Sequence, residues 1–264
     1  MTTWASLHRL TQQVQQLPPE HRHTSQQLSQ VMVSAHSTLI EGSRVSVPAA
    51  IEFLLGTTAS ALDLTVPLAG YDMLGDHAQA LALALQRASA GQLPGPALLR
   101  ELAAAAMHST GRLTHSVLGT VDAARGDLRR GNVFIVGASA FPNAQKVPAL
   151  VVALTSDLRD RMPLTTTLQD KLELAFEAHQ RLVSIHPFND GNGRTARLLM
   201  NYVQHYHDQP LTVVFREDRR AYFAALEASR VADDLSIFFD FMRGQHGKSL
   251  RYQLRAVPPA DESR

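Results

Sequence analysis

The chain of 264 residues contains 45% hydrophobic residues and has a formal net charge of +1, from 25 basic and 24 acidic side chains. This composition is typical of a globular protein with a buried core and excludes a largely disordered chain. Because the charges nearly balance, no strong field exists to attract nucleic acid or an anionic membrane, and we expect neither as a partner.

The cysteine count and the hydropathy pattern indicate the cellular compartment in which the protein is expected. The sequence has no cysteine, which excludes disulfides, thiolate nucleophiles and cysteine zinc sites and suits a reducing compartment. The polar first residues lack the basic flank and apolar run of a signal peptide. Glu52 and Asp63 interrupt the most apolar region, which falls short of the roughly 20 apolar residues of a spanning helix. We therefore expect a cytoplasmic protein.

Helical periodicity dominates the first part of the chain. In residues 25–42 the apolar residues recur every three or four positions, and Gly42 follows as a left-handed stop. Residues 72–89 and 96–107 are rich in Ala and Leu, which are strong helix formers. We predict three helices here, with residues 1–24 and the tail AVPPADESR, residues 256–264, at the periphery.

Residues 131–150 are the exception to the helical pattern. A run of β-forming residues lies between Gly131 and Gly137, and Pro142 and Pro148 interrupt the return. We predict a short two-stranded flap, which leans on the helices because an isolated hairpin is marginally stable. Its first strand would contain Val133, Phe134, Ile135 and Val136.

The segment HPFNDGNGRTAR, residues 186–197, lies between two further predicted helices. Apolar residues from Leu168 to Val183 share one helical face and lead directly to His186, and a second helix is expected to begin near Gly193. The segment is therefore a helix–loop–helix junction.

Gly191, Asn192 and Gly193 suit an anion-binding loop. Glycines on both sides of a polar residue, just before a helix, let successive backbone N–H groups point into one concavity, where the helix dipole adds positive charge. Taken alone, the same three residues also fit a plain turn.

Two arginines follow on one face of the predicted helix. Arg194 and Arg197 are three residues apart, so like charges face each other near the positive end of the helix dipole. A bound di- or triphosphate would compensate them through paired hydrogen bonds. A solvated surface pair is the alternative.

The same segment contains a carboxylate and an imidazole. Mg²⁺ typically takes one or two protein carboxylates together with phosphate oxygens, so Asp190 suffices as the protein ligand; a helix N-cap is its alternative role. His186 could accept a proton from an attacking hydroxyl, although a lone histidine is often structural.

Together these residues resemble the signature of the Fic (filamentation induced by cyclic AMP) family, H-P-F-x-[D/E]-G-N-G-R-x-x-R, and match it at every specified position. The resemblance implies an all-α Fic fold, a helical bundle with a short β-hairpin flap beside the active-site loop. It further implies a nucleotidyltransferase of the protein adenylyltransferase type, which transfers AMP from ATP to a hydroxyl side chain of a target protein.

The resemblance also implies a role for each residue. His186 would deprotonate the target hydroxyl, and Asp190 would hold Mg²⁺, with Mn²⁺ as an alternative. The backbone at Gly191 and Gly193, with Asn192, would form the anion hole. Arg194 and Arg197 would hold the β- and γ-phosphates. The flap, residues 133 to 147 with Lys146 near its end, would bind the target by strand addition; a merely structural hairpin is the alternative. The resemblance allows a homodimer.

A second motif precedes this core. STLIEG, residues 37–42, resembles the inhibitory motif [S/T]-x-x-x-E-[G/N] of Fic proteins, here formed by Ser37, Glu41 and Gly42. Glu41 could pair with Arg197 and occupy the space of the γ-phosphate, while Ser37 adds a hydrogen bond toward the anion-binding loop. A solvated glutamate at a helix end is the alternative.

Other activities remain open at this point. Glu41 could instead orient water, which would make the protein a de-AMPylating hydrolase or a bifunctional enzyme, and some Fic-like proteins transfer phosphate or phosphocholine. A nucleotide-sensing regulator is a third hypothesis.

We expect an N-terminal extension (1–24), a helical region (25–110) with the inhibitory helix (25–42), a Fic core (111–245) and a C-terminal tail (246–264).

Overall fold

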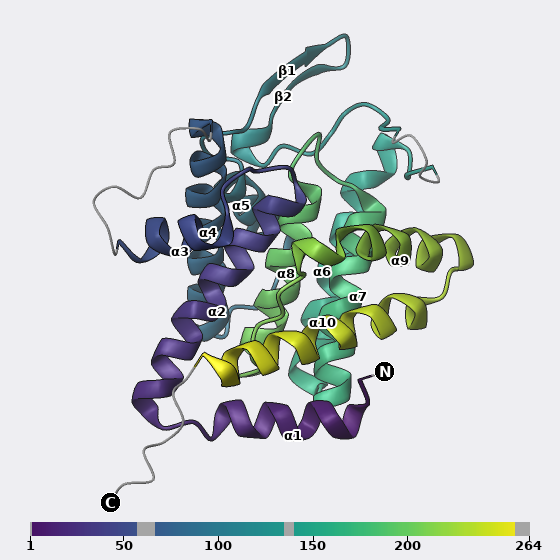
Figure 1. The fold of residues 1–264 in the computed structure, drawn as a ribbon. Coiled ribbons are helices and arrows are strands. Elements are labelled where there is room, and N and C mark those ends of the chain that lie inside the picture. Colours follow the sequence, from purple (N-terminus) through teal and green to yellow (C-terminus); the bar gives the residue numbers. More distant parts are fainter. Residues whose placement is uncertain (1, 57–66, 135–139, 257–264) are drawn as a thin grey trace, which may run out of the picture.

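The computed structural model describes residues 2–56, 67–134 and 140–256. These residues form α-helices and one small antiparallel sheet, drawn in Figure 1. The helices are α1 (Trp4–Gln15), α2 (Pro19–Ile40), α3 (Val47–Leu55), α4 (Leu68–Ser89), α5 (Pro96–Ala106), α6 (Val147–Arg161), α7 (Leu168–Ile185), α8 (Asn192–Tyr206), α9 (Arg219–Ala232) and α10 (Leu235–Arg255). The strands are β1 (Leu113–Ser116) and β2 (Gly119–Asp122). The all-α prediction is confirmed.

Helix α8 lies at the centre of the bundle (Figure 1). It packs against α2, α4, α5 and α7, and Leu198, Leu199 and Tyr202 on it are almost fully buried. Because neighbouring helices enclose α8, Arg194 and Arg197 in its first turns are buried. The position of the functional site follows from this arrangement.

Local sequence signals set the helix ends that matter for the site. Thr167 caps α7 by accepting a hydrogen bond from the backbone N–H of Asp170 at 3.1 Å. Helix α2 begins with proline at its first position and ends before Gly42, whose φ of 101° is left-handed. Helices α2, α4, α5, α7 and α8 therefore agree with the predicted helices.

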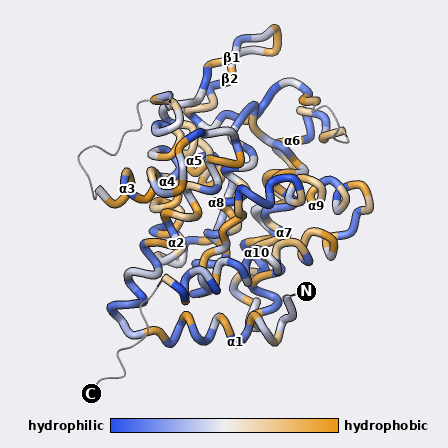
Figure 2. Tube along the Cα trace, viewed as in Figure 1, coloured by the Kyte–Doolittle hydropathy of each residue, from blue (hydrophilic) through white to orange (hydrophobic). Residues whose placement is uncertain are grey.

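The N-terminal residues are not peripheral, which corrects the prediction for residues 1–24, whereas residues 257–264 of the predicted peripheral tail lie outside the described residues. Leu7 on α1 and Leu250 on α10 are both fully buried in the main core cluster, and α1 packs against α10. Figure 2 shows hydrophobic and hydrophilic residues alternating along α1, as expected for a helix with one buried face. Amphipathic spacing alone could not reveal that α1 and α10 cover each other.

The two-stranded hairpin lies earlier in the chain than predicted. Strands β1 and β2 pair in an antiparallel register from Leu113 opposite Asp122 to Ser116 opposite Gly119. Within 131–150, the described residues form no strand: Val133 and Phe134 are irregular, and Ala144–Lys146 is a 3₁₀ helix. Ile135 and Val136 lie outside the described residues. The predicted position of the strands was therefore wrong for Val133 and Phe134.

The side chain of Arg129 explains why residues 131–134 and 140–143 do not pair as strands. Its guanidinium donates to the carbonyl oxygens of Gly131 at 2.9 Å and Pro142 at 2.5 Å. The Asn132 side chain also accepts from the backbone N–H of Ala144 at 2.9 Å. Side chains therefore close this loop and take hydrogen-bonding groups that a β-ladder would need.

None of the described helices combines the length and apolar character that spanning a bilayer requires.

Candidate active site

The loop between α7 and α8 is held in place by its own residues. Asn192 accepts a hydrogen bond from the backbone N–H of Phe188 at 2.9 Å and donates to the carbonyl of Phe188 at 2.8 Å. The Phe188 side chain is 2% exposed and joins the main core. This reciprocal bridge closes the loop, so Asn192 acts here through its side chain on the loop itself rather than by pointing that side chain at an anion.

Gly191 is the residue that the turn into α8 requires. Its φ is 79°, and a Cβ built at this position would lie 2.8 Å from the sulfur of Met107. Any other residue would be strained and crowded. The backbone N–H groups that follow belong to the first turn of α8, where no intrahelical acceptor is available. The predicted anion-binding loop therefore has the backbone form that a phosphate site needs.

His186 ends α7 in a left-handed conformation, with φ of 51°. Its carbonyl accepts from Nε of Arg129 at 2.7 Å, and the adjacent Pro187 carbonyl accepts from the backbone N–H of Arg129 at 2.8 Å. The ring of Phe141 lies 4.4 Å from the imidazole, centroid to centroid. These contacts fix a conformation that a non-glycine residue rarely adopts.

The environment of His186 keeps its imidazole neutral. Burial lowers the pKa of His186 to about 4; the backbone of Val183 and Glu41 oppose this change, whereas Arg129 and Arg230 favour it. At neutral pH the ring is therefore unprotonated, which is the form that can accept a proton. An anionic substrate beside the ring would raise the pKa again.

Arg197 is buried and has four hydrogen bonds. It is 2% exposed. Its Nη2 lies 2.6 Å from Oε1 of Glu41 and 3.1 Å from the carbonyl of Ser37, and its Nε donates to Oγ of Ser37 at 2.8 Å. Its Nη1 donates to the hydroxyl of Tyr222 at 3.3 Å. Burial opposes the charge, but Tyr222 and Glu41 raise the pKa of Arg197 above its ordinary value.

The structure therefore brings the two predicted motifs together. Glu41 and Ser37, at the end of α2, both contact Arg197 on α8. Ser37 bonds Arg197 rather than the anion-binding loop. Glu41 also lies against the loop, because a Cβ built on Gly193 would be 2.5 Å from Oε1 of Glu41. The carboxylate thus occupies the space directly beside the start of α8.

Arg194 has a different environment from that of Arg197. It is also 2% exposed, but its Nη1 donates to the carbonyl of Ala106 at 3.1 Å and lies 3.5 Å from Oγ1 of Thr110. Its Nη2 lies 3.4 Å from Oδ1 of Asp190. Its Nε has no acceptor among the described residues. The two arginines share one helix but face different neighbours.

Asp190 suits a metal ligand that acts together with a phosphate. Its side chain is 68% exposed, and Oδ1 accepts from the backbone N–H of Gly191 at 2.5 Å. The described residues contain no cluster of three or more acidic, histidine or cysteine side chains that could hold a metal alone. An exposed carboxylate beside an anion-binding loop fits Mg²⁺, which prefers oxygen ligands and shares them with phosphates.

A cavity of about 480 Å³ lies beside His186 and Glu41, a volume in the usual range for ligand sites. Asp190, Arg194 and Arg197 are not among the described residues that line it. Glu41, His186 and Gly193 line one part of it, and Tyr222, Phe223 and Leu226 line another. One wall is therefore polar and carries the reactive groups, and the other is apolar and aromatic. The arrangement suits a ligand with a charged end and a flat organic end.

Tyr222 and Arg129 are functional candidates to which the sequence reasoning assigned no role. The hydroxyl of Tyr222 lies 2.8 Å from Nε2 of His179, and both side chains are fully buried. Because this hydroxyl accepts from Arg197, its own proton points to His179, and burial keeps the pKa of His179 well below its ordinary value. Such contacts join residues far apart in the chain, so no local pattern could have shown them.

The cavity thus brings together His186, the start of α8 and the carboxylate that contacts the buried Arg197. In comparison with known proteins, residues 96–204, which are less than half of the chain, match the Fic/DOC family.

Two curated relatives are about one third identical to this chain over the aligned region. "Protein adenylyltransferase fic-1" from Caenorhabditis briggsae is 35% identical over 119 residues, which cover 44% of this chain and 22% of the relative. "Protein adenylyltransferase Fic" from Aedes aegypti is 35% identical over 118 residues, or 44% and 23% of the two chains. The match spans less than a quarter of the length of these relatives.

A solved structure confirms the fold over nearly the whole chain. A Fic-domain-containing signalling protein from Bacteroides thetaiotaomicron superposes with a TM-score of 0.78 at 21% identity, covering 98% of both chains. The likeness at this identity concerns the fold alone, and it includes α1 and α10 as well as the Fic domain.

Proposed function

We propose that this protein is an adenylyltransferase that transfers AMP from ATP to a hydroxyl side chain of a target protein. The observation that carries the proposal is that His186, the first turn of α8 and the Glu41 carboxylate next to Arg197 border one cavity. The relatives named protein adenylyltransferase, which share the Fic domain, support it.

The proposed reaction is a displacement at the α-phosphorus of ATP. Nε2 of His186 takes the proton of the target hydroxyl, whose oxygen forms a bond to the α-phosphorus as the bond to the β-phosphate oxygen breaks. Pyrophosphate leaves, and AMP remains on the target. The first N–H groups of α8 and the guanidinium of Arg197 stabilise the phosphate charges. Asp190 would hold Mg²⁺, which neutralises part of that charge when it is bound.

The same geometry supports autoinhibition by Glu41. A carboxylate 2.6 Å from Arg197 competes with a γ-phosphate for that guanidinium. A bias of ~1.4 kcal/mol toward the closed pair would reduce the competent population about tenfold. Arg197 must exchange one anion for the other before ATP can bind productively.

Target binding is assigned to the segment around Val133, Phe134 and Lys146. Phe134 is 84% exposed, and Arg129 links this segment to the carbonyl of His186. A target chain that lies along it would therefore be delivered to the imidazole. We propose that an incoming chain pairs with backbone groups of this segment other than those that Arg129 and Asn132 bind.

Glu41→Gly tests the activity and its inhibition together. With α-labelled ATP and a cell extract, we expect at least about tenfold more label on protein than with the wild type. Glu41→Gln is the matched control: it keeps the side-chain size but removes the charge, and an intermediate rate is expected. Equal labelling by all three proteins would refute inhibition by Glu41, and absence of label from all three would refute AMP transfer.

A hydrolytic activity is the second candidate, because Glu41 lines the same cavity as His186. A carboxylate there could orient water toward an AMP-modified side chain. The measurement is release of AMP from labelled target. If wild-type protein releases AMP and the Glu41→Gln protein does not, the carboxylate acts in hydrolysis.

A further inference from the structure

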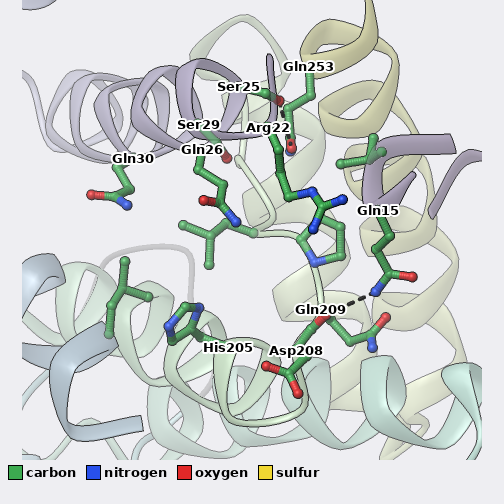
Figure 3. Close-up of a pocket in the computed structure, with 14 residues that line it drawn as sticks. Gln15, Arg22, Ser25, Gln26, Ser29, Gln30, His205, Asp208, Gln209 and Gln253 are labelled. Carbon is green, nitrogen blue, oxygen red and sulfur yellow. Dashed lines mark hydrogen bonds between the residues drawn. The ribbon is translucent and has the colours of Figure 1, made fainter. Parts of the chain in front are cut away.

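A cavity of about 340 Å³ at the other end of α2 from Glu41 is crossed by contacts within the chain. Figure 3 shows the polar side chains that line it. Arg22 donates to the carbonyl of Leu17 and Gln15 to the carbonyl of Asp208, each at 3.0 Å. These donors therefore bind the chain itself, in contrast to the groups that surround His186.

The cavity beside His186 has a cluster of three side chains on its wall. The ring of Phe141 lies 4.4 Å from the imidazole of His186, centroid to centroid, with the rings tilted by 38°. Cζ of Arg230 also lies 4.4 Å from the centroid of the Phe141 ring. All three residues line the cavity. A guanidinium on α9 is therefore linked to the imidazole at the end of α7 through one aromatic ring.

The backbone on both sides of the ring contact is fixed by Arg129. Its guanidinium donates to the carbonyl of His186 at 2.7 Å and to the carbonyl of Pro142, the residue after Phe141, at 2.5 Å. The Arg129 side chain is buried. Because one rigid, planar group ties the two segments together, the backbones that carry the two rings keep a constant separation.

The guanidinium of Arg230 is held by two partners. Glu227, one turn earlier on α9, pairs with its Nη2, and the Phe141 ring lies beside its Cζ. Its Nη1 is buried and has no hydrogen-bond acceptor among the described residues. A cation within about 6 Å of an aromatic ring is attracted by the negative charge on the ring face, and more strongly where water is excluded. The arginine therefore stabilises the observed place of the ring.

The ring contact determines which part of the imidazole is open. Nδ1 of His186 is buried, so Nε2 is the nitrogen that can meet a target hydroxyl. A general base must lie within hydrogen-bond reach of the proton that it takes. A displacement of about 1 Å can lower the rate about 10²-fold. A ring in contact with the imidazole restricts its rotation and so keeps Nε2 in place.

We propose that Phe141 and Arg230 are positioning residues for His186: Phe141 holds the imidazole with Nε2 toward the cavity, and Arg230 holds Phe141. Their importance for AMP transfer rests on the proposed function, whereas their effect on the imidazole does not. Neither side chain needs to touch the reacting atoms for this role.

The charges around the imidazole provide a signature that can be measured without activity. Burial lowers the pKa of His186 to about 4, and the cations of Arg129 and Arg230 act in the same direction. The backbone of Val183 and the carboxylate of Glu41 oppose this change. Loss of the cation at position 230, or of the ring that covers the imidazole, should therefore raise this pKa toward its ordinary value of about 6.5.

An NMR titration of the histidine ring signals of the full chain tests this effect. His186→Ala identifies the His186 signal by its disappearance. Between about pH 5 and pH 8 that signal should stay constant in the wild type, because the imidazole is neutral throughout. In Phe141→Ala and in Arg230→Gln it should begin to titrate in this range. Circular dichroism at each pH confirms that the variants are folded.

Two further variants separate positioning from general stability. Arg230→Lys retains the cation beside the ring and should behave as the wild type. Arg243→Gln is the matched control: Arg243 on α10 also pairs with an acid three residues earlier, Asp240, and lies 5.4 Å from the ring of Trp4, outside the cavity of His186. It loses the same two kinds of contact, and its His186 signal should remain constant.

Kinetics measure the consequence for the reaction. In the Glu41→Gly background, Phe141→Ala should lower kcat for AMP transfer about tenfold or more and change KM for ATP less than about threefold, because a displaced base slows the chemical step without weakening nucleotide binding. Arg230→Gln should have the same effect to a smaller degree, and Arg230→Lys should restore most of the rate.

The possible outcomes distinguish this assignment from the proposed function. If the His186 signal stays constant in Phe141→Ala and Arg230→Gln, as in Arg243→Gln, the positioning role is refuted. If KM for ATP rises while kcat is unchanged, Phe141 binds the nucleotide instead, which also refutes it. If the signal titrates as expected but the Glu41→Gly protein transfers no AMP, the positioning role holds and the proposed function fails.

Discussion

Two contacts at the start of α8 hold neighbouring arginines in different ways. On the α5 side, Arg194 donates to the Ala106 carbonyl at 3.1 Å and lies near the Thr110 hydroxyl. On the α2 side, Arg197 meets the carboxylate of Glu41 at 2.6 Å. A backbone carbonyl is a fixed part of the fold, whereas a side-chain carboxylate at a helix end can be displaced by another anion. The α5 contact therefore belongs to the fold, and the α2 contact is the one that we propose as a switch.

The largest expected effect is on the rate of AMP transfer, when the imidazole of His186 is removed from a protein that lacks the contact between Glu41 and Arg197. In the Glu41→Gly background, His186→Ala should lower AMP transfer by a factor of about 10² to 10⁴, the usual contribution of a general base. Incorporation of α-labelled AMP into protein measures the rate. The affinity for ATP should not change. A parallel loss of ATP affinity would show that His186 positions the nucleotide instead.

Substitutions that remove one partner of each contact should have a smaller effect, on the free energy of unfolding. Glu41→Gln should lower the free energy of unfolding by about 1–2 kcal/mol, because Arg197 stays buried without its counter-ion; the 29% exposure of Glu41 keeps the figure modest. Thr110→Val should change it by about 0.5 kcal/mol or less, because Arg194 keeps the Ala106 carbonyl. Urea denaturation measures both. Equal losses would remove the distinction between the two contacts.

A further expected effect concerns the pH dependence of stability on the α2 side. Burial lowers the pKa of His36 on α2 to about 4, with Glu217 opposing and Lys248 and Arg216 assisting, and its Nδ1 accepts from the backbone N–H of Arg216 at 3.0 Å. The unfolded chain takes up this proton near pH 6.5 and the folded chain only near pH 4. The free energy of unfolding should therefore fall as pH decreases from about 6.5 to about 4.

A matched pair of variants isolates the contribution of His36. His36→Gln, which retains an acceptor, should flatten the dependence of unfolding free energy on pH by up to about one proton. His115→Gln on the exposed strand β1 should leave the slope unchanged. An identical slope in both variants would assign the acid sensitivity to the other buried histidines, among them His207 and His246.

Agreement between sequence and structure is closest where the determinants are local. The helix over residues 25–42, the stop at Gly42 and the junction at residues 186–197 depend on periodicity and on glycine, and all appear as expected. The strand prediction at Val133 and Phe134 failed because it used β-propensity alone. The guanidinium of Arg129 binds the carbonyls of Gly131 and Pro142 on the two sides of this segment, and propensity contains no information about such a side-chain partner.

By itself, the sequence determined the helical class, the order of the reactive residues and the motif that precedes them, because helix period and turn chemistry act over a few residues. Only the tertiary structure decided that Arg197 faces Glu41 while Arg194 faces Ala106, and that Tyr222 and His179 support Arg197 from behind. Those choices depend on how α2, α5, α7 and α9 pack around α8. Long-range packing sets which buried donor meets which acceptor, and spacing along the chain does not encode it.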